Sequence, residues 1–132
     1  MKRNPVVHFE MPAHDRDRMA GFYSKAFGWT YQLLGAEMGN YVTVQTAETD
    51  ENRMVKQPGA INGGFYPIEP GVPQPAPSLV IAVDDINEAI ENIKSAGGKI
   101  LGEATDIPGI WAFAAFLDTE GNRVTILQPL KM

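Results

Sequence analysis

An imidazole and a carboxylate stand two residues apart near the start of the chain, at His8 and Glu10. In a β-strand, residues two apart point to the same face, so both side chains would lie on one side of a sheet. An imidazole titrates near neutral pH and can act as a base or as a hydrogen-bond donor. A carboxylate on a buried face beside it can serve as an acid or a base. The pair is therefore the first candidate for proton-transfer chemistry.

Each of these residues also has a purely structural interpretation. His8 can be a hydrogen-bonded and chemically inert residue, and Glu10 can form an ion pair with Arg123 in the last predicted strand. The second histidine, His14, immediately precedes a helical segment and is expected at the surface. With two histidines and no cysteine in the chain, a nucleophilic triad is not predicted.

Length and composition indicate a soluble protein of ordinary domain size. The 132 residues include no cysteine, which suits a reducing compartment, and a chain of this length buries a core without disulfides. No apolar stretch is long enough for a membrane-spanning helix, and the N-terminus lacks the apolar segment of a secretion signal. The net charge is −5, from 16 acidic and 11 basic residues, and the basic residues form no stripe. We therefore expect a cytoplasmic protein that binds neither nucleic acid nor membranes.

The segment that begins with the histidine predicts a strand, a helix and three strands. Residues 5–11 read as a strand, and a helix follows between a cap at Asp15 and a stop at Gly28. Its apolar face is expected to consist of Met19, Phe22, Tyr23, Ala26 and Phe27. Residues 29–34 and 41–46 predict a hairpin, and residues 61–68 a third strand. The Gly63-Gly64 pair either weakens the middle of that strand or lets another backbone or a ligand come close.

The second half repeats this order at an offset of 70 residues, which relates Asp15 to Asp85 and Gly28 to Gly98. Residues 78–83 predict a strand, and Asp85 caps a helix. The apolar face of that helix comprises Ile86, Ala89, Ile90 and Ile93. Strands at residues 99–104, 110–117 and 123–127 complete the unit. A repeat this long indicates a duplicated module and not a solenoid.

The pattern predicts an α+β fold of two βαβββ modules that form a curved, open-sided, eight-stranded mixed sheet with the helices outside. Residues 1–132 are expected to be a single domain, with module one at 5–68 and module two at 78–129. The Pro-rich residues 69–77 would be a stiff connector between them.

Motifs placed on this pattern resemble the vicinal oxygen chelate superfamily, which includes glyoxalase I, bleomycin-resistance proteins and extradiol dioxygenases. They are a histidine in the first strand, an aromatic end to the first helix (Phe22, Tyr23, Phe27, Gly28, Trp29) and a D-x-E-G-N turn (Asp118 to Asn122). The resemblance covers nearly the whole chain, and small bacterial proteins described as lactoylglutathione-lyase-related look most similar. It defines the fold more closely than the reaction.

The resemblance also implies where a metal would be held, in the first and last strands of each module. His8 matches the first of these positions, but its counterpart in module two is Ser78, and Thr125 replaces the carboxylate of the last strand. Residues 61–68 offer no Asp, Glu or His. Divalent transition metals need three or four such ligands, and Glu10 would add only one. We therefore expect no metal and no other cofactor.

A cavity shared by the two modules is the expected site. Its polar groups would be His8 and Glu10, with His8 and Ser78 in equivalent places of the repeat. The further lining residues expected are Val80, Thr125 and Leu127, together with the aromatic residues Tyr41, Trp111 and Phe113.

Three functions remain open at this stage. The first is a metal-independent lyase-like or isomerase-like protein of the glyoxalase-related group, in which His8 and Glu10 transfer protons. The second is a protein without catalytic activity that sequesters a small toxin or antibiotic, as the resemblance to bleomycin-resistance proteins implies. The third, a metal-dependent lyase or dioxygenase, is disfavoured by the missing ligands. In each case the expected partners are a small-molecule ligand and a second copy of the chain in a homodimer.

Overall fold

The chain folds as two compact units, each of which contains one α-helix packed on a four-stranded sheet. The structure is a computed structural model, and it describes residues 2–52, 54–71, 75–107 and 111–129. The N-terminal unit comprises His8–Pro77, and the C-terminal unit comprises Met1–Val7 with Ser78–Met132. The described residues form two βαβββ modules, with eight strands in mixed sheet and two α-helices. The predicted α+β fold class is confirmed.

In the N-terminal unit the strands lie in the order β2-β3-β4-β1. These strands are β1 (Val6–Ala13), β2 (Thr30–Leu33), β3 (Val42–Gln45) and β4 (Asn62–Pro67). β1 and β4 are parallel, whereas β3 is antiparallel to both β2 and β4. A short 3₁₀ helix, η1 (Ala36–Met38), lies in the predicted turn between β2 and β3. β2 is therefore an edge strand of this unit.

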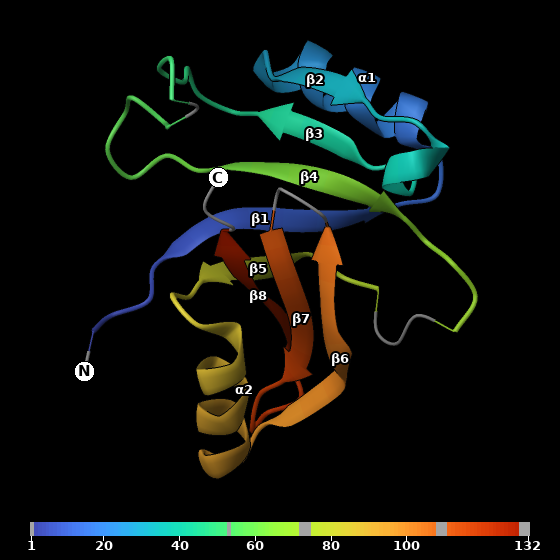
Figure 1. The fold of residues 1–132 in the computed structure, drawn as a ribbon. Helices are drawn as coiled ribbons and strands as arrows, with labels where there is room; N and C mark the ends of the chain where they lie inside the picture. Colours follow the sequence, from blue (N-terminus) through green and yellow to red (C-terminus); the bar gives the residue numbers. More distant parts are fainter. Residues whose placement is uncertain (1, 53, 72–74, 108–110, 130–132) are drawn as a thin grey trace. The chain divides into compact units, whose positions relative to one another are not determined.

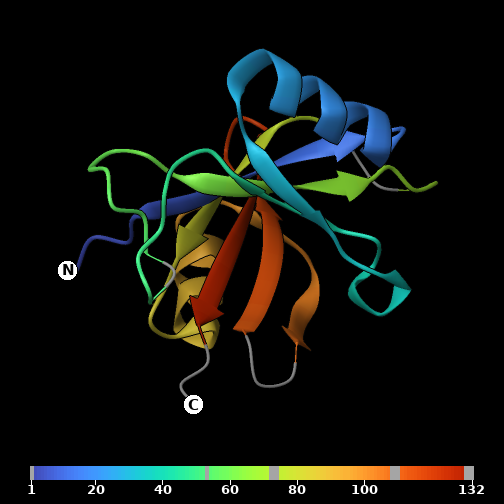
Figure 2. The same ribbon diagram turned by 90° about the horizontal axis from the view of Figure 1, so that it is seen from above.

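Helix α1 (Arg16–Phe27) begins and ends at the residues that the sequence indicates. The Asp15 carboxylate accepts a hydrogen bond from the backbone N–H of Arg18, and Gly28 ends the helix in the left-handed conformation, with φ of 75°. Figure 2 shows α1 lying along the strands of this unit. Ala20 of the helix is buried in a core with four residues of the sheet: Ala13, Val42, Val44 and Phe65.

The side chains of β1 divide between the two faces of its sheet. Phe9 and Met11 pack against the core beneath α1. Because strand residues alternate, His8 and Glu10 project from the opposite face. The β1 strand thus turns its apolar residues toward the helix and its ionisable residues away from it.

The expected apolar face of α1 is only partly buried, which corrects the sequence prediction. Met19 and Tyr23 pack on the core, but Phe22 and Phe27 are 58% and 64% exposed. The five apolar residues cover more of the helix surface than the sheet can contact, so the residues at the edges of this apolar face, Phe22 and Phe27, remain in solvent. Tyr23 stacks on Trp29 with ring centroids 4.7 Å apart, and this contact anchors the end of the helix.

In the C-terminal unit the strands lie in the order β5-β8-β7-β6 (Figure 1). They are β5 (Ser78–Ala82), β6 (Lys99–Ile107), β7 (Trp111–Leu117) and β8 (Arg123–Pro129). β5 and β8 are parallel, and the other pairs are antiparallel. β6 continues past the predicted end at residue 104, because a register shift between Leu101 and Thr105 lets pairing resume. The predicted β7 start at residue 110 and residues 72–74 of the connector lie outside the described residues.

Helix α2 (Ile86–Ser95) covers one face of this second sheet. The Asp85 carboxylate accepts hydrogen bonds from the backbone N–H groups of Asn87 and Glu88, and the Gln128 side chain accepts one from Ile86. Of the predicted apolar residues of α2, Ile86 belongs to a buried cluster with Val83, Ala112, Ala114 and Ile126, and Ala89, Ile90 and Ile93 pack against that cluster. The helix therefore fixes which face of β5, β7 and β8 is core and which face is not.

Candidate functional site

A histidine and a tyrosine meet on the face of the N-terminal sheet that α1 does not cover. Nε2 of His8 in β1 lies 3.0 Å from the phenol oxygen of Tyr41, the residue before β3. Both side chains are partly buried. Glu10, two residues along β1, hydrogen-bonds the same phenol. The three residues form a continuous hydrogen-bonded chain, which we call the relay.

A glycine in the intervening strand makes room for this contact. Gly64 of β4 lies opposite Glu10 of β1 and Thr43 of β3. A Cβ atom at Gly64 would overlap the ring of Tyr41, so the ring lies directly over the β4 backbone. On the other face, a Cβ at Gly63 would lie 2.5 Å from the ring of Phe9. The Gly-Gly pair thus admits one aromatic ring on each face. The groups that come close are side-chain rings, where the sequence suggests a backbone, a ligand or a weakened strand.

Burial shifts the pKa values of both the His8 imidazole and the Tyr41 phenol. Desolvation raises the pKa of Tyr41, and the negative charge of Glu10 and the hydrogen bond to it raise that pKa further. Desolvation also lowers the pKa of His8 below 6.5, the ordinary value for a histidine. At neutral pH the phenol therefore keeps its proton and the imidazole is neutral.

These protonation states assign the direction of the hydrogen bonds. A phenol has one proton, and its bond to Glu10 uses that proton because an ionised carboxylate is only an acceptor. The phenol oxygen must then accept from His8, which places the imidazole proton on Nε2. The other ring nitrogen, Nδ1, is left with its lone pair. Within the described residues no hydrogen bond to Nδ1 is found, and Nδ1 is the atom that can take up a proton.

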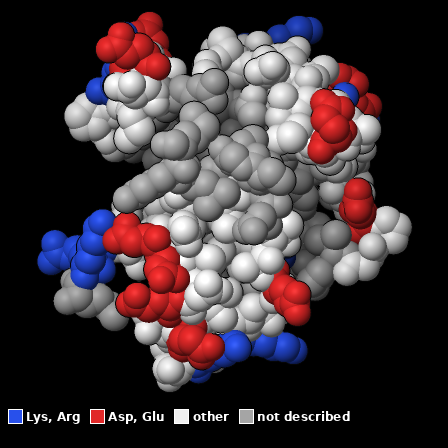
Figure 3. Space-filling view, in the orientation of Figure 1, with Lys and Arg blue, Asp and Glu red and all other residues white. Residues whose placement is uncertain are grey.

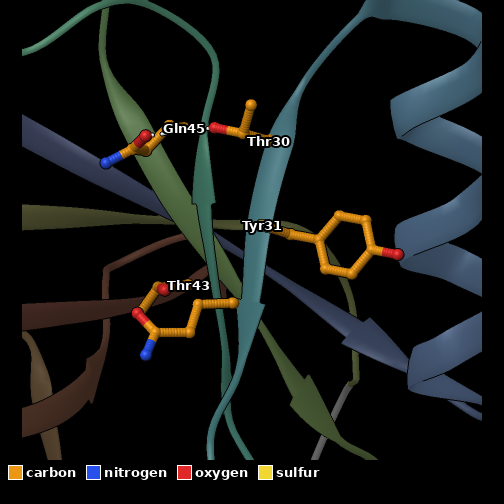
Figure 4. Close-up of a pocket in the computed structure, with 5 residues that line it drawn as sticks. Thr30, Tyr31, Thr43 and Gln45 are labelled. Carbon is orange, nitrogen blue, oxygen red and sulfur yellow. Dashed lines mark hydrogen bonds between the residues drawn. The ribbon is translucent and has the colours of Figure 1, made fainter.

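The remaining polar residues of this face lie on β2, β3 and β4. Thr30 pairs with Gln45, and Gln32 with Thr43. These four residues and Tyr31 line a shallow depression of about 210 Å³ (Figure 4), where the hydroxyl of Thr30 donates to the side-chain oxygen of Gln45 at 3.0 Å. Tyr31 points away from the other labelled side chains in that view. The depression offers neutral hydrogen-bonding groups, and no residue of the relay lines it.

Asn62 has a structural role on the same sheet. Its side-chain oxygen accepts hydrogen bonds from the backbone N–H groups of Thr46 and Ala47, at 2.8 and 3.2 Å. Asn62 lies opposite His8 across the β1–β4 pair. Its amide holds the chain where it leaves β3 and is therefore not assigned to the site.

In the C-terminal unit, the residues predicted to line the site occupy the sheet face opposite α2. Val80 pairs with Thr125, and Leu127 pairs with Phe113. Val80 and Thr125 are 4% and 7% exposed. Strand alternation adds Ser78 and Trp111 to this face. The sequence also predicts that these residues share one cavity with the relay, and that expectation concerns both units together and stays a prediction.

The donor residues do not fit a metal centre of imidazole and carboxylate ligands. The positions that the resemblance implies hold His8, Ser78 and Thr125, and Nε2 of His8 is engaged by Tyr41. In the described part of the chain, no three His, Asp or Glu side chains are grouped closely enough to hold a metal ion. One imidazole and two hydroxyls are too few donors of the preferred types. No chemical step is therefore assigned to a metal.

A duplicated βαβββ module, in which one helix covers one face of four strands, defines the class of α+β proteins to which this fold belongs. The family model described as Glyoxalase/Bleomycin resistance protein/Dioxygenase superfamily matches residues 6–126. The chain belongs to this superfamily, and the resemblance inferred from the sequence is confirmed.

Similar proteins are named as glyoxylases. A glyoxylase-like domain-containing protein of Didymella fabae is 33% identical over 120 residues, which cover 89% of this chain and 88% of that protein. A putative glyoxylase, CFP32, of Mycobacterium tuberculosis is 27% identical over 125 residues, which cover 94% of this chain and 44% of that protein. The chain thus spans less than half the length of the mycobacterial relative.

Solved structures share the fold at low sequence identity. A methylmalonyl-CoA epimerase superposes with a TM-score of 0.67 and 14% identity, over 96% of this chain and 95% of that one. A hypothetical protein from Bacillus halodurans C-125 gives 0.70 and 13%, over 99% and 98%. At these identities the likeness shows the fold alone.

Two further observations concern the distribution of charge on the surface and the character of the helices. On the face drawn in Figure 3, the acidic and basic side chains of the described residues are interspersed, without a continuous basic surface. In the part of the chain that the structure describes, no helix has the length and apolar character needed to cross a membrane.

Sequence reasoning placed Tyr41 only among the aromatic wall residues and missed its hydrogen bonds to His8 and Glu10. The Gly63-Gly64 pair was an ambiguous signal, because it indicates either a weakened strand or a close approach to β4. The polar depression on β2 and β3 was also missed. Its signal is the alternation of Thr30 with Gln32 and of Thr43 with Gln45, which predicts a polar sheet face.

Proposed function

We propose that this protein binds a small molecule and transfers a proton on it without a metal, as a lyase or isomerase of the glyoxalase-related group. The observation that carries this proposal is the 3.0 Å contact between His8 and Tyr41, with Glu10 bonded to the same phenol. Nδ1 of His8 is the proposed base. Glu10 and Tyr41 are the groups that orient it and balance its charge.

In the proposed chemistry, His8 acts first as a general base and then as a general acid, while Tyr41 and Glu10 hold its ring in place. When Nδ1 removes a proton from the ligand, the imidazole becomes a cation, and its Nε2–H remains hydrogen-bonded to Tyr41. The phenol transmits the negative charge of Glu10 toward that cation without giving up its own proton. The same Nδ1–H then returns the proton to the ligand at the same or another atom. A proton removed and returned is an isomerisation, and removal followed by loss of a leaving group is a lyase reaction.

The names of similar proteins support this class of reaction, but they do not identify a substrate. The relatives are named as glyoxylases, and one protein of the same fold is named as an epimerase. An epimerase inverts one carbon centre, which proton removal and return can accomplish. The ligand of this chain is therefore proposed to carry a proton beside a carbonyl group, where removal is easiest.

The alternative function is sequestration of a small toxin or antibiotic without turnover. It is favoured by the depression on β2 and β3, whose lining residues carry hydroxyl and amide groups and no carboxylate or imidazole. Such a surface can hold a ligand by neutral hydrogen bonds but supplies no acid or base. Binding there would not involve the relay.

One experiment separates the two functions. A library of small carbonyl compounds and antibiotics is screened for a rise in melting temperature, because a ligand of the native state raises apparent stability. Each hit is then incubated with protein in D₂O, and its C–H signals are followed by NMR. Loss of a C–H signal with the wild type, but not with His8→Gln or Glu10→Gln, is expected for proton transfer. Hits that bind without deuterium exchange, equally well in both variants, would establish sequestration instead.

We also propose that the protein works as a homodimer. β2 is an edge strand of its sheet, and its Tyr31 and Leu33 are 44% and 40% exposed. An apolar edge strand is normally covered, because its free backbone groups can pair with another chain. Light scattering at micromolar concentration should report twice the chain mass, and a monomer at all concentrations would contradict the proposal.

A further inference from the structure

We infer that the C-terminal unit carries a binding site for a small oxyanion, a carboxylate or phosphate group, formed by Arg123 of β8 and Ser78 of β5. The inference is independent of the proposed proton transfer, because neither residue belongs to the relay. It assigns a ligand chemistry to two residues outside the relay.

Strand register brings the two residues to one face of the sheet. β5 and β8 are parallel neighbours in which Val80 lies opposite Thr125. Ser78 and Arg123 each stand two residues earlier on these strands, so they emerge from the same face as that pair. The residues of the other parity, Ile81 and Ile126, pack toward α2. The Ser78–Arg123 site therefore lies on the face that the helix leaves free.

Both residues carry a buried polar atom without a partner. Among the described residues, Oγ of Ser78 and Nε of Arg123 are the two buried side-chain atoms that lack a hydrogen bond. Two salt bridges are found among the described residues, between Lys2 and Asp84 and between Lys94 and Glu91, and neither involves Arg123. A buried donor without an acceptor is unfavourable and uncommon in native proteins. Two such donors on adjacent strands indicate that a bound group supplies the missing acceptor.

The donor chemistry selects the ligand. A guanidinium presents parallel N–H groups that match the two oxygens of a carboxylate or phosphate, and it has no acceptor of its own. The Ser78 hydroxyl adds a third donor. Leu117 of β7 lies directly opposite Arg123, and Lys99 of β6 lies opposite Leu117, so this row of the sheet continues with an apolar side chain and then a second cation. A small organic acid with a few apolar carbons fits that sequence of groups.

The test is a titration of the full chain with sodium acetate and, separately, with sodium phosphate, at constant ionic strength with chloride as the reference anion. The readout is the NMR signal of the arginine Nε–H groups, in which Arg123 is identified by its absence in Arg123→Met. This signal should shift and saturate with at least one of the two anions. Tighter acetate binding would identify a carboxylate ligand, and tighter phosphate binding a phosphorylated one.

Four variants make the result specific. In the two variants that lack Arg123, anion binding is followed by the backbone amide signal of Ser78, which is also recorded for the wild type. Arg123→Lys keeps the charge but loses the planar pair of N–H groups, and binding should weaken about tenfold or more. Arg123→Met should abolish binding, and Ser78→Ala should weaken it severalfold. Arg18→Met, on the exposed surface of α1, should leave it unchanged. Because Arg123→Met removes an unpartnered buried donor, it should melt no lower than the wild type without anion, and added anion should raise only the wild-type melting temperature.

Two results would overturn the inference. One is the absence of a saturable Arg123 shift with acetate and with phosphate at concentrations on the order of 100 mM, well beyond the millimolar range of weak sites. The other is binding that Arg123→Lys and Arg123→Met leave intact, which would place the anion elsewhere. If Arg123→Met fails to fold, Arg123→Lys still decides the question, because a site that depends on charge alone would bind equally well in that variant.

Discussion

The Tyr41 phenol and the His8 imidazole meet at 3.0 Å although 33 positions separate them in the chain. The contact crosses β4, and it exists because Gly64 leaves the ring of Tyr41 room above the backbone. Glu10 completes the relay from the same strand as His8. Stability, protonation and chemistry at this face are therefore coupled, and each can be measured separately.

Removing the phenol oxygen should destabilise the fold. Tyr41→Phe leaves Nε2 of His8 and one bonding position of Glu10 without the partner that they have in the wild type. Unsatisfied buried groups of this kind lower the free energy of unfolding by about 1–3 kcal/mol. Urea denaturation would measure the change. The matched control is Tyr31→Phe, because Tyr31 is 44% exposed, and equal effects of the two variants would contradict the role given to the Tyr41 hydroxyl.

Tyr41 should not ionise in the folded protein near pH 10, where a solvent-exposed tyrosine loses its proton. Burial and Glu10 raise the pKa of Tyr41, so the native state holds the proton where the unfolded state has lost it. Stability therefore falls as pH rises above about 10, and this part of the decline should be absent in Tyr41→Phe. Ultraviolet titration of phenolate would test the point. An ordinary phenolate signal that Tyr41→Phe removes from the folded protein would refute it.

His8 should remain neutral to a pH below 6.5, the value at which an exposed histidine is half protonated. Desolvation lowers the pKa of His8 in the native state, so between that pKa and about 6.5 the unfolded state binds the extra proton. The contribution of neutral His8 to folding stability is complete above pH 6.5 and is lost as pH falls through the native pKa of His8. NMR titration of the His8 ring would give the midpoint. Denaturation of His8→Gln as a function of pH should lack this loss, and a midpoint above 6.5 would reverse the sign and contradict the prediction.

Gly64 should tolerate no side chain. Gly64→Ala would place Cβ within the ring of Tyr41, so the ring must move or the strands must separate. Overpacking of this kind destabilises by about 1–3 kcal/mol. The control is Gly21→Ala in α1, where nothing lies within 4 Å of the added atom and helix propensity predicts a gain of roughly 0.5–1 kcal/mol. Thermal melting of both variants measures the contrast, and a neutral Gly64→Ala would show that the ring is not confined.

Purified protein should hold much less than one Ni, Zn, Fe or Mn ion per chain. Ser78 and Thr125 stand at positions where metal-dependent members of the superfamily are expected to carry ligands, and His8 alone cannot hold such an ion well. Elemental analysis after expression with added metal measures this content. Stoichiometric metal that His8→Gln removes would overturn the expectation, and with it the proposal that proton transfer here needs no metal.

The sequence by itself determined the duplicated module and the order of its elements. Hydrophobic periodicity, the caps at Asp15 and Asp85 and the stop at Gly28 are local signals, and the hydrogen bonds at the helix ends reproduce the caps and the stop. Strand alternation also separates His8 and Glu10 from Phe9 and Met11, because a face is fixed by parity alone.

Tertiary structure alone decided which residues meet across strands. The pairing of β3 with β4 and of β4 with β1 brings Tyr41 to His8, and the pairing of β5 with β8 places Ser78 and Arg123 on one face of their sheet. Partners in a sheet depend on long-range register, which a single sequence does not specify. The same limit explains Phe22 and Phe27, whose exposure depends on how much of α1 the sheet covers and not on the helical pattern itself. Chemistry at these faces therefore follows from pairings that arise only when the sheets form.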